Sequence, residues 1–123
     1  MVMAMGSEAS KYIRLRIRMT NDEAAIGPGK ADLLELIADK GSISAAAREM
    51  GMSFRRAWAL VQIMNTAFVQ PLVKCETGGS HGGGASLTAE GIKILKEYRS
   101  AEEAAMKAAR PHIKRIRARM RKE

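Results

Sequence analysis

Hydrophobic and polar residues alternate at the start of the chain. Between Lys11 and Thr20 the apolar positions are Ile13, Leu15, Ile17 and Met19, with Arg14, Arg16 and Arg18 between them. A period of two predicts a half-buried strand, and we expect the arginine side to face solvent at a sheet edge, where charge discourages pairing with other chains. Turn residues between Asn21 and Gly29 then break the chain before a helix.

A period near 3.6 replaces the alternation after this break and predicts three consecutive helices. The predicted ranges are Lys30 to Asp39, ended by Gly41; Ser44 to Met50, capped by Ser42 or Ser44 and closed by Gly51; and the residues after Ser53 up to about Phe68. The apolar face of the third helix consists of Ala57, Leu60, Val61 and Met64. Pro71 prevents that helix from continuing.

A hairpin and a long helix complete the predicted order of elements. Alternation from Leu72 to Thr77 and a short run from Ala85 to Leu87 predict two strands, joined by a segment with five glycines. Thr88 is the expected N-cap of a helix that extends to about Arg110, where Pro111 ends or kinks it. This order predicts a mainly α fold with a small β-sheet, namely a winged helix-turn-helix with a long C-terminal helix.

Composition supports one folded domain with a basic end. Of the 123 residues, 46% are hydrophobic and only 4% are aromatic, so we expect a single core of aliphatic side chains. The formal net charge is +8, and residues 107–123 hold eight Lys/Arg and one Glu. We therefore divide the chain into a disordered N-terminus (1–10), a winged helix-turn-helix domain (11–110) and a basic tail (111–123). Ile113, Ile116 and Met120 recur in the tail at helical spacing, which predicts a basic amphipathic helix when the tail meets a partner.

The second and third helices meet the geometric requirements of a helix-turn-helix. Ala47 is small where the two helices approach, Gly51 can adopt the left-handed conformation that the turn needs, and Ala57 and Leu60 face inward. The stretch from Ser42 to Ala67 is therefore the predicted DNA-reading unit. An ordinary helical hairpin in a core is the alternative that these positions leave open.

The outward side of the third helix favours duplex DNA. Ser53, Phe54, Arg55 and Arg56 begin this helix, where backbone N–H groups can hold a phosphate and an arginine can read guanine. Further contacts to DNA are expected from Ser42, Ser44 and Gln62 and, in the glycine-rich wing, from Gly79, Ser80, His81 and Gly82, while Asn65 could reach adenine or a phosphate. A solvated arginine face, a disordered loop and an unengaged His81 are the alternatives.

Two features allow more than one interpretation. Trp58 either packs beneath the wing, which we favour, or faces DNA. A seam on the long helix suits close packing, against a partner subunit or against the chain's own core. Its members are Ile94, Tyr98, Ala101, Ala105 and Ala108.

The segment GSISAAAREMGMSFRRAWALVQIMN, from Gly41 to Asn65, resembles the winged helix of the molybdate-responsive ModE regulators and, more distantly, the head of LysR-type regulators. LVKCETGGSHGGGASLT, from Leu72 to Thr88, is similar to the wing of the ModE family. The resemblance covers about residues 11–105 and implies a DNA-binding homodimer, with the first strand and the long last helix in the subunit contact. Full-length ModE proteins carry oxyanion-binding domains after that helix, where this chain has its basic tail. We therefore carry over DNA binding and not molybdate sensing.

Catalysis, a metal site and a bound cofactor are not expected. The chain has one cysteine and two widely separated histidines, so neither a nucleophile–base set nor a metal-ligand spacing is present. Without a signal segment or a long apolar run, we expect a cytoplasmic protein with no membrane contact. The predicted function is a transcriptional regulator that reads an inverted repeat in double-stranded DNA as a homodimer. A winged-helix adaptor for protein interaction or dimerisation is the alternative.

Overall fold

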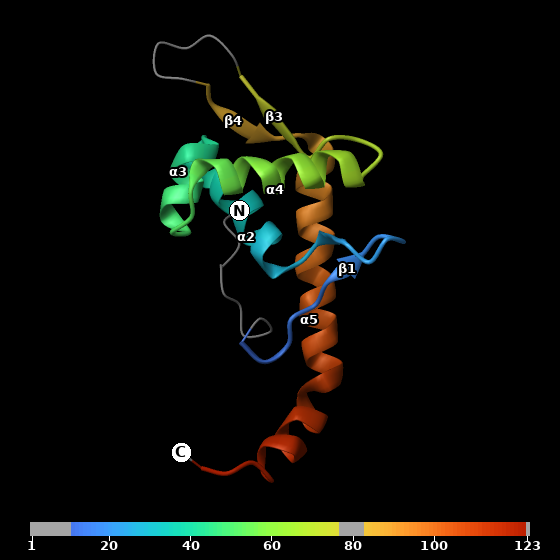
Figure 1. Cartoon of the computed structure of the whole chain (residues 1–123). Coiled ribbons are helices and arrows are strands. Elements are labelled where there is room, and N and C mark those ends of the chain that lie inside the picture. The colour runs from blue at the N-terminus through green and yellow to red at the C-terminus, as the bar shows by residue number, and fades with distance from the viewer. Residues whose placement is uncertain (1–10, 77–82, 123) are drawn as a thin grey trace.

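A long helix and a group of three shorter helices form the body of the protein, and a hairpin projects from one end (Figure 1). The computed structural model describes residues 11–76 and 83–122. Its elements are β1 (Ile17–Arg18), β2 (Ala24–Ile26), α2 (Pro28–Lys40), α3 (Ile43–Glu49), α4 (Phe54–Ala67), β3 (Val73–Cys75), β4 (Ala85–Leu87) and α5 (Ala89–Arg117). The strands form two antiparallel pairs, β1 with β2 and β3 with β4. The predicted mainly α fold with a winged helix-turn-helix and a long last helix is confirmed.

The N-terminal segment contains less strand than its alternation predicts. Residues 11–12 are helical, β1 has only two residues, and Ile17, expected to be buried, is 46% exposed. The prediction of a strand from Lys11 to Thr20 is therefore wrong over most of its length. Its partner β2 was not predicted, because three residues are too few to show a period, and the register between the two strands shifts at Ile17/Arg18.

Residues 11–16 contact side chains of α5 and do not form part of a longer strand. The Tyr98 hydroxyl donates a hydrogen bond of 2.6 Å to the Leu15 carbonyl oxygen, and the Arg117 guanidinium lies 4.8 Å from the centroid of the Tyr12 ring. Burial raises the pKa of the Tyr98 hydroxyl, so this group remains a donor. Tyr98 of the predicted seam thus packs within its own chain, whereas Ala108 of that seam is exposed.

The long helix extends beyond its predicted end. Pro111 lies inside α5, which continues to Arg117, so the predicted boundary near Arg110 is wrong. Proline lacks an N–H and cannot bond to the carbonyl one turn earlier, which favours a bend. Figure 1 shows α5 changing direction toward its C-terminal end, as expected for a kink rather than a stop.

The core lies where α2 meets α3, α4 and α5. Its largest fully buried side chains come from α2, α4 and the residue before β3: Leu33, Leu34, Ile37, Val61, Met64 and Leu72. None of these six is aromatic, in agreement with the predicted aliphatic core. Burial of each such side chain contributes about 1.5–3 kcal/mol to folding.

A buried charge cluster joins α5 to α2. The Arg99 guanidinium donates to Asp32 Oδ1 (2.6 Å), Glu35 Oε1 (2.8 Å) and Glu102 Oε1 (2.9 Å). Burial alone would lower the pKa of Arg99, but these three carboxylates raise it, so the guanidinium stays charged. Burial also raises the pKa of the Glu35 carboxyl. The cluster fixes which turn of α5 lies against α2.

The wing, α4 and α5 meet around the backbone of Leu72. Its carbonyl oxygen accepts a hydrogen bond from Thr88 N (2.9 Å), and Thr88 Oγ1 donates to the Pro71 carbonyl (2.7 Å). Thr88 also caps α5 by accepting from Gly91 N, as predicted. A Cβ at Gly91 would lie 2.1 Å from the Leu72 oxygen, so only glycine permits this approach.

We predict that Gly91→Ala lowers the free energy of unfolding by about 2–3 kcal/mol, because the backbone at Leu72 has to move. Gly29→Ala is the matched control, since a Cβ at Gly29 in α2 meets nothing within 4 Å. We expect this control to be neutral or to stabilise by about 0.5 kcal/mol. Urea unfolding of both variants measures the difference, and equal stabilities would contradict the account of this junction.

Candidate nucleic-acid interface

The turn between α3 and α4 has the geometry of a helix-turn-helix. Gly51 adopts a left-handed conformation with φ of 68°, and Met52 N donates to the Ala47 carbonyl oxygen (3.0 Å). Ala47 is 2% exposed and Ala57 is fully buried, so small side chains allow α3 and α4 to approach closely. Both alanines and the glycine therefore have the roles that the sequence predicts.

The N-terminal end of α4 is an open, positively charged surface. Ser53 caps the helix, and its Oγ accepts a hydrogen bond of 3.1 Å from Arg56 N. The N–H groups of Phe54 and Arg55 have no intrahelical acceptor, since they precede the first helical hydrogen bond. Residues 53–56 are all exposed, and neither arginine has an ion pair within the described chain. This end can therefore receive a phosphate or a base edge.

The exposed and buried sides of α4 are clearly separated. Ala57, Val61 and Met64 are fully buried, and at 100° per residue Arg55 lies on the opposite side. No acidic residue occurs in α4, whose sequence is FRRAWALVQIMNTA. Trp58 is 47% exposed, so about half of its surface is accessible, and its packing beneath the wing or against DNA stays a prediction.

Asn65 connects α4 to the wing. Its Oδ1 accepts hydrogen bonds from Leu72 N (2.9 Å) and Val73 N (3.0 Å), and its Nδ2 donates to the Val73 carbonyl oxygen (3.0 Å). The amide group is thus committed to the start of β3 and not to adenine or a phosphate, which corrects the expectation for this residue. The signal missed was its distance of only eight residues from the start of β3, a strand whose backbone needs hydrogen-bond partners.

The other end of the wing is attached to the α2–α3 corner. Ala85 N, at the start of β4, donates to the Gly41 carbonyl oxygen (2.8 Å). Val73 pairs with Leu87 and Cys75 with Ala85 in the antiparallel hairpin. Lys74, between the two β3 partners, is exposed, and the alternation of this strand already places it on the outer side. It adds a cation to the wing that the predicted contact set lacks.

The remaining predicted contact residues fall into three groups. Ser42 is half-buried and its Oγ accepts from Ala45 N (3.0 Å), so its side chain caps α3, while Ser44 is exposed on the first turn of the same helix. Gln62 is half-buried on α4. The predicted wing contacts Gly79, Ser80, His81 and Gly82 lie outside the described residues. The structure thus brings Ser53, Phe54, Arg55 and Arg56 together at one helix end.

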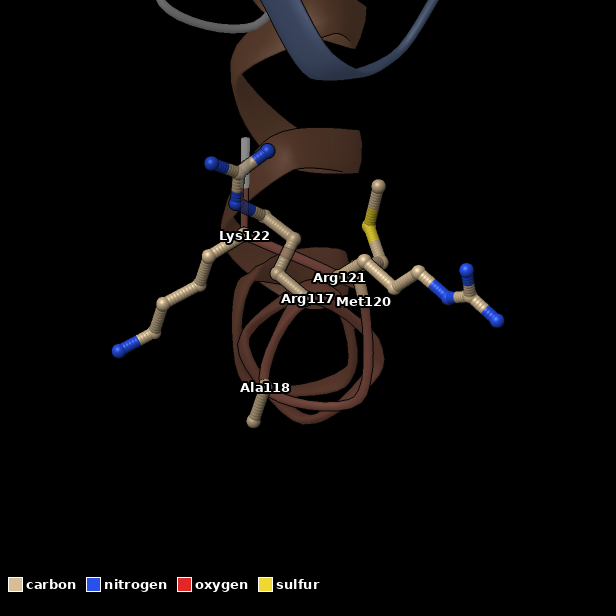
Figure 2. A pocket seen from close by; sticks show the side chains of 5 residues that line it. All are labelled: Arg117, Ala118, Met120, Arg121 and Lys122. Atoms are coloured by element: carbon tan, nitrogen blue, oxygen red, sulfur yellow. The ribbon is translucent and has the colours of Figure 1, made fainter.

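A second concentration of positive charge lies at the opposite end of α5 from the wing. Residues 107–122 contain eight Lys/Arg and no Asp or Glu. An open pocket there is lined by Arg117, Ala118, Met120, Arg121 and Lys122. Figure 2 shows the charged ends of its three cationic side chains pointing in different directions. They do not converge on one point, so the arrangement suits an extended polyanion better than a small ligand.

Residues 30–92, just over half of the chain, match the family described as "Bacterial regulatory helix-turn-helix protein, lysR family". The chain belongs to this family. The matched range begins in α2 and ends in the first turn of α5. The matched range therefore includes α3, α4 and the described strands of the wing, which confirms a helix-turn-helix within Ser42 to Ala67, while DNA reading by these residues stays a prediction.

Relatives of this lysR-family chain include proteins named for molybdenum. It is 46% identical over 79 residues to the molybdenum-pterin-binding protein MopB of Rhodobacter capsulatus, covering 64% of this chain and 29% of that protein. It is 34% identical over 94 residues to the molybdenum transport protein ModE of Azotobacter vinelandii, covering 76% and 35%. For the DNA-binding transcriptional dual regulator ModE of Escherichia coli K12 the identity is 41% over 71 residues, covering 58% and 27%. The resemblance to ModE is confirmed, and the chain spans about a third of the length of these curated relatives.

A solved structure shares the fold of this lysR-family chain. The match to the chain in "Crystal structure of CbnR_DBD-DNA complex" has a TM-score of 0.54 and 22% identity, and covers 74% of this chain and 97% of that chain. At this identity the match shows the fold alone.

Within residues 11–76 and 83–122, no three His, Cys, Asp or Glu side chains are grouped so that they could hold a metal ion. Among these residues, no helix has both the length and the apolar character needed to cross a membrane.

We predict that Asn65→Ala lowers the free energy of unfolding by about 2–3 kcal/mol, because two N–H groups and one carbonyl of the wing lose their partner. Thr66→Ala is the control: Thr66 is exposed, and its hydroxyl donates only to carbonyls of its own helix. We expect this control to change stability by less than about 0.5 kcal/mol. Thermal unfolding of both variants measures the difference in stability. An Asn65→Ala variant as stable as the control would refute the connection between α4 and the wing through Asn65.

Proposed function

We propose that this chain is a sequence-specific, double-stranded DNA-binding transcriptional regulator that acts in the cytoplasm and is not an enzyme. The observation that carries the proposal is the end of α4, where Ser53, Arg55 and Arg56 are exposed beside free backbone N–H groups. Unpaired guanidiniums and a helix N-terminus together favour phosphate and guanine as ligands. Membership of the lysR helix-turn-helix family supports the same function.

The wing and α4 would contact one duplex together. The hydrogen bonds of Asn65 hold the base of the hairpin beside α4, and the bond from Ala85 to Gly41 holds the other end of the wing at the α2–α3 corner. Lys74 then faces outward from the wing, where it can meet a phosphate. The sequence also predicts DNA contacts from residues 79–82, which lie outside the described residues. Relatives of this chain are named for molybdenum-pterin binding and molybdenum transport, which supports genes of molybdenum transport or use as the ones it regulates.

We predict a steep loss of affinity for duplex DNA with added salt, with a slope of about −0.9 in log affinity against log salt for each phosphate contacted. Arg55→Ala and Arg56→Ala should each lower affinity about tenfold, since each removes an unpaired cation from the reading surface. Lys96→Ala, an exposed cation on α5, is the control and should leave affinity for the reading site unchanged. Fluorescence anisotropy at several salt concentrations measures the salt dependence and the affinity of each variant for duplex DNA. Affinity that ignores salt and both arginines would favour the protein-adaptor alternative.

We further propose a homodimer through the first strand and α5. Two apolar side chains near the end of α5, Ile116 and Met120, are 63% and 59% exposed, and Ile92 near its start is 56% exposed. A second copy would remove such surface from water.

We expect sedimentation to give twice the monomer mass, and Ile116→Glu with Met120→Glu to shift the protein to monomers. The dimer should bind an inverted repeat whose half-sites lie about 34 Å apart, or a multiple of that, more tightly than a single half-site. A monomer both in solution and on DNA would overturn this part of the proposal.

The basic tail, residues 111–123, would strengthen binding without reading sequence. Its cations diverge, as Figure 2 shows for three of them, which suits the regular negative charge of a DNA backbone. We predict that removing residues 111–123 lowers affinity for all duplex sequences and flattens the salt dependence; because the deletion also removes Ile116 and Met120 of the proposed dimer contact, the loss should be larger for an inverted repeat. Replacing Arg119, Arg121 and Lys122 by Gln should have a smaller effect in the same direction, while unchanged non-specific binding in both would contradict the prediction.

A further inference from the structure

Two aromatic rings are exposed side by side on α4. Phe54 is 52% exposed and Trp58 is 47% exposed, and residues four apart are neighbours on a helix surface. The chain has only five aromatic residues, and the core is filled without these two. Large apolar side chains that stay together in water are typical of a binding surface rather than of chain folding.

The rings lie on a defined flank of α4. At 100° per residue, Trp58 falls between outward-facing Arg55 and the buried side, on the flank that also carries Asn65. Asn65 is bonded to β3, so this is the flank that faces the wing. A ligand held by both the end of α4 and the wing therefore passes over Phe54 and Trp58.

The positive charge near Phe54 and Trp58 indicates which chemical class of ligand would bind over these rings. Arg55 is the outward-facing neighbour of the rings, about 60° around the helix from Trp58, and α4 has no carboxylate. The occupant therefore combines negative charge with apolar groups. Duplex DNA does so at thymine, whose C5-methyl group projects into the major groove beside the phosphates. The groove is about 12 Å wide and admits an α-helix.

We infer that Phe54 and Trp58 make the chain selective for thymine by contacting its C5-methyl group. This inference rests on the proposed DNA-binding function and adds the base that the reading helix prefers. Arg55 would supply the polar part of the readout, and the two rings would supply the apolar part. A protein partner that covers the rings, including a second copy of this chain, is the competing occupant.

The test replaces thymine by deoxyuridine, which keeps base pairing and removes only the methyl group. A duplex is first selected with the full chain from a pool of random sequences, and each thymine is then exchanged singly. We expect about a fourfold loss of affinity at one or two positions, the effect of exposing one methyl-sized group. With Phe54→Ala or Trp58→Ala, thymine and uracil at that position should bind equally.

Val69→Ala is the matched control, because Val69 lies just beyond α4 and is 97% exposed. This control should keep the wild-type ratio between thymine and uracil duplexes. Failure to select any duplex would overturn the proposed function itself. Selection followed by equal binding of all uracil duplexes to the wild-type chain would overturn only the inference about thymine, and this arm needs no variant. The inference also fails if Trp58→Ala leaves the ratio unchanged and instead dissociates a dimer.

Discussion

The angle between the reading helix and the wing depends on one side-chain amide. Asn65 uses its oxygen for two N–H groups and its nitrogen for one carbonyl at the start of β3, which leaves the wing little freedom relative to α4. The backbone of Leu72 then accepts from Thr88 and lies against Gly91, so α5 is fixed at the same place. Three elements that would contact or support DNA thus share one junction, and its stability sets the shape of the whole interface.

The buried guanidinium of Arg99 is neutralised by neighbouring carboxylates, whereas the exposed cations at the start of α4 and the end of α5 are not. Arg99 is enclosed by Asp32, Glu35 and Glu102, whose carboxylates offset the cost of burying a guanidinium. Arg55 and Arg56 have no carboxylate beside them on α4, and the end of α5 has none among residues 107–122. The net charge of +8 therefore lies where a polyanion can reach it.

Local periodicity was sufficient for the helices, the hairpin and the turn at Gly51, because their signals lie within a few residues. Periodicity failed where contacts between residues distant in sequence determine the local conformation. Residues 11–20 lie along α5 through Tyr98 and Arg117, distant in sequence, and so do not form the strand that their alternation predicts. Pro111 bends α5 but does not end it. The cluster at the start of α4 was predictable from capping and charge, whereas the structural role of Asn65 and the exposure of Trp58 depend on tertiary packing.

DNA contact is proposed at one defined end of the molecule, and NMR titration of the full chain with its selected duplex tests this most directly. Backbone amide shifts should be largest for residues 53–58 and for Lys74 in the wing. The amides of α2 and of the middle of α5 should change little, since both lie away from the proposed surface. Shifts concentrated on α5, with residues 53–58 unaffected at saturation, would contradict the assignment of α4 as the reading helix.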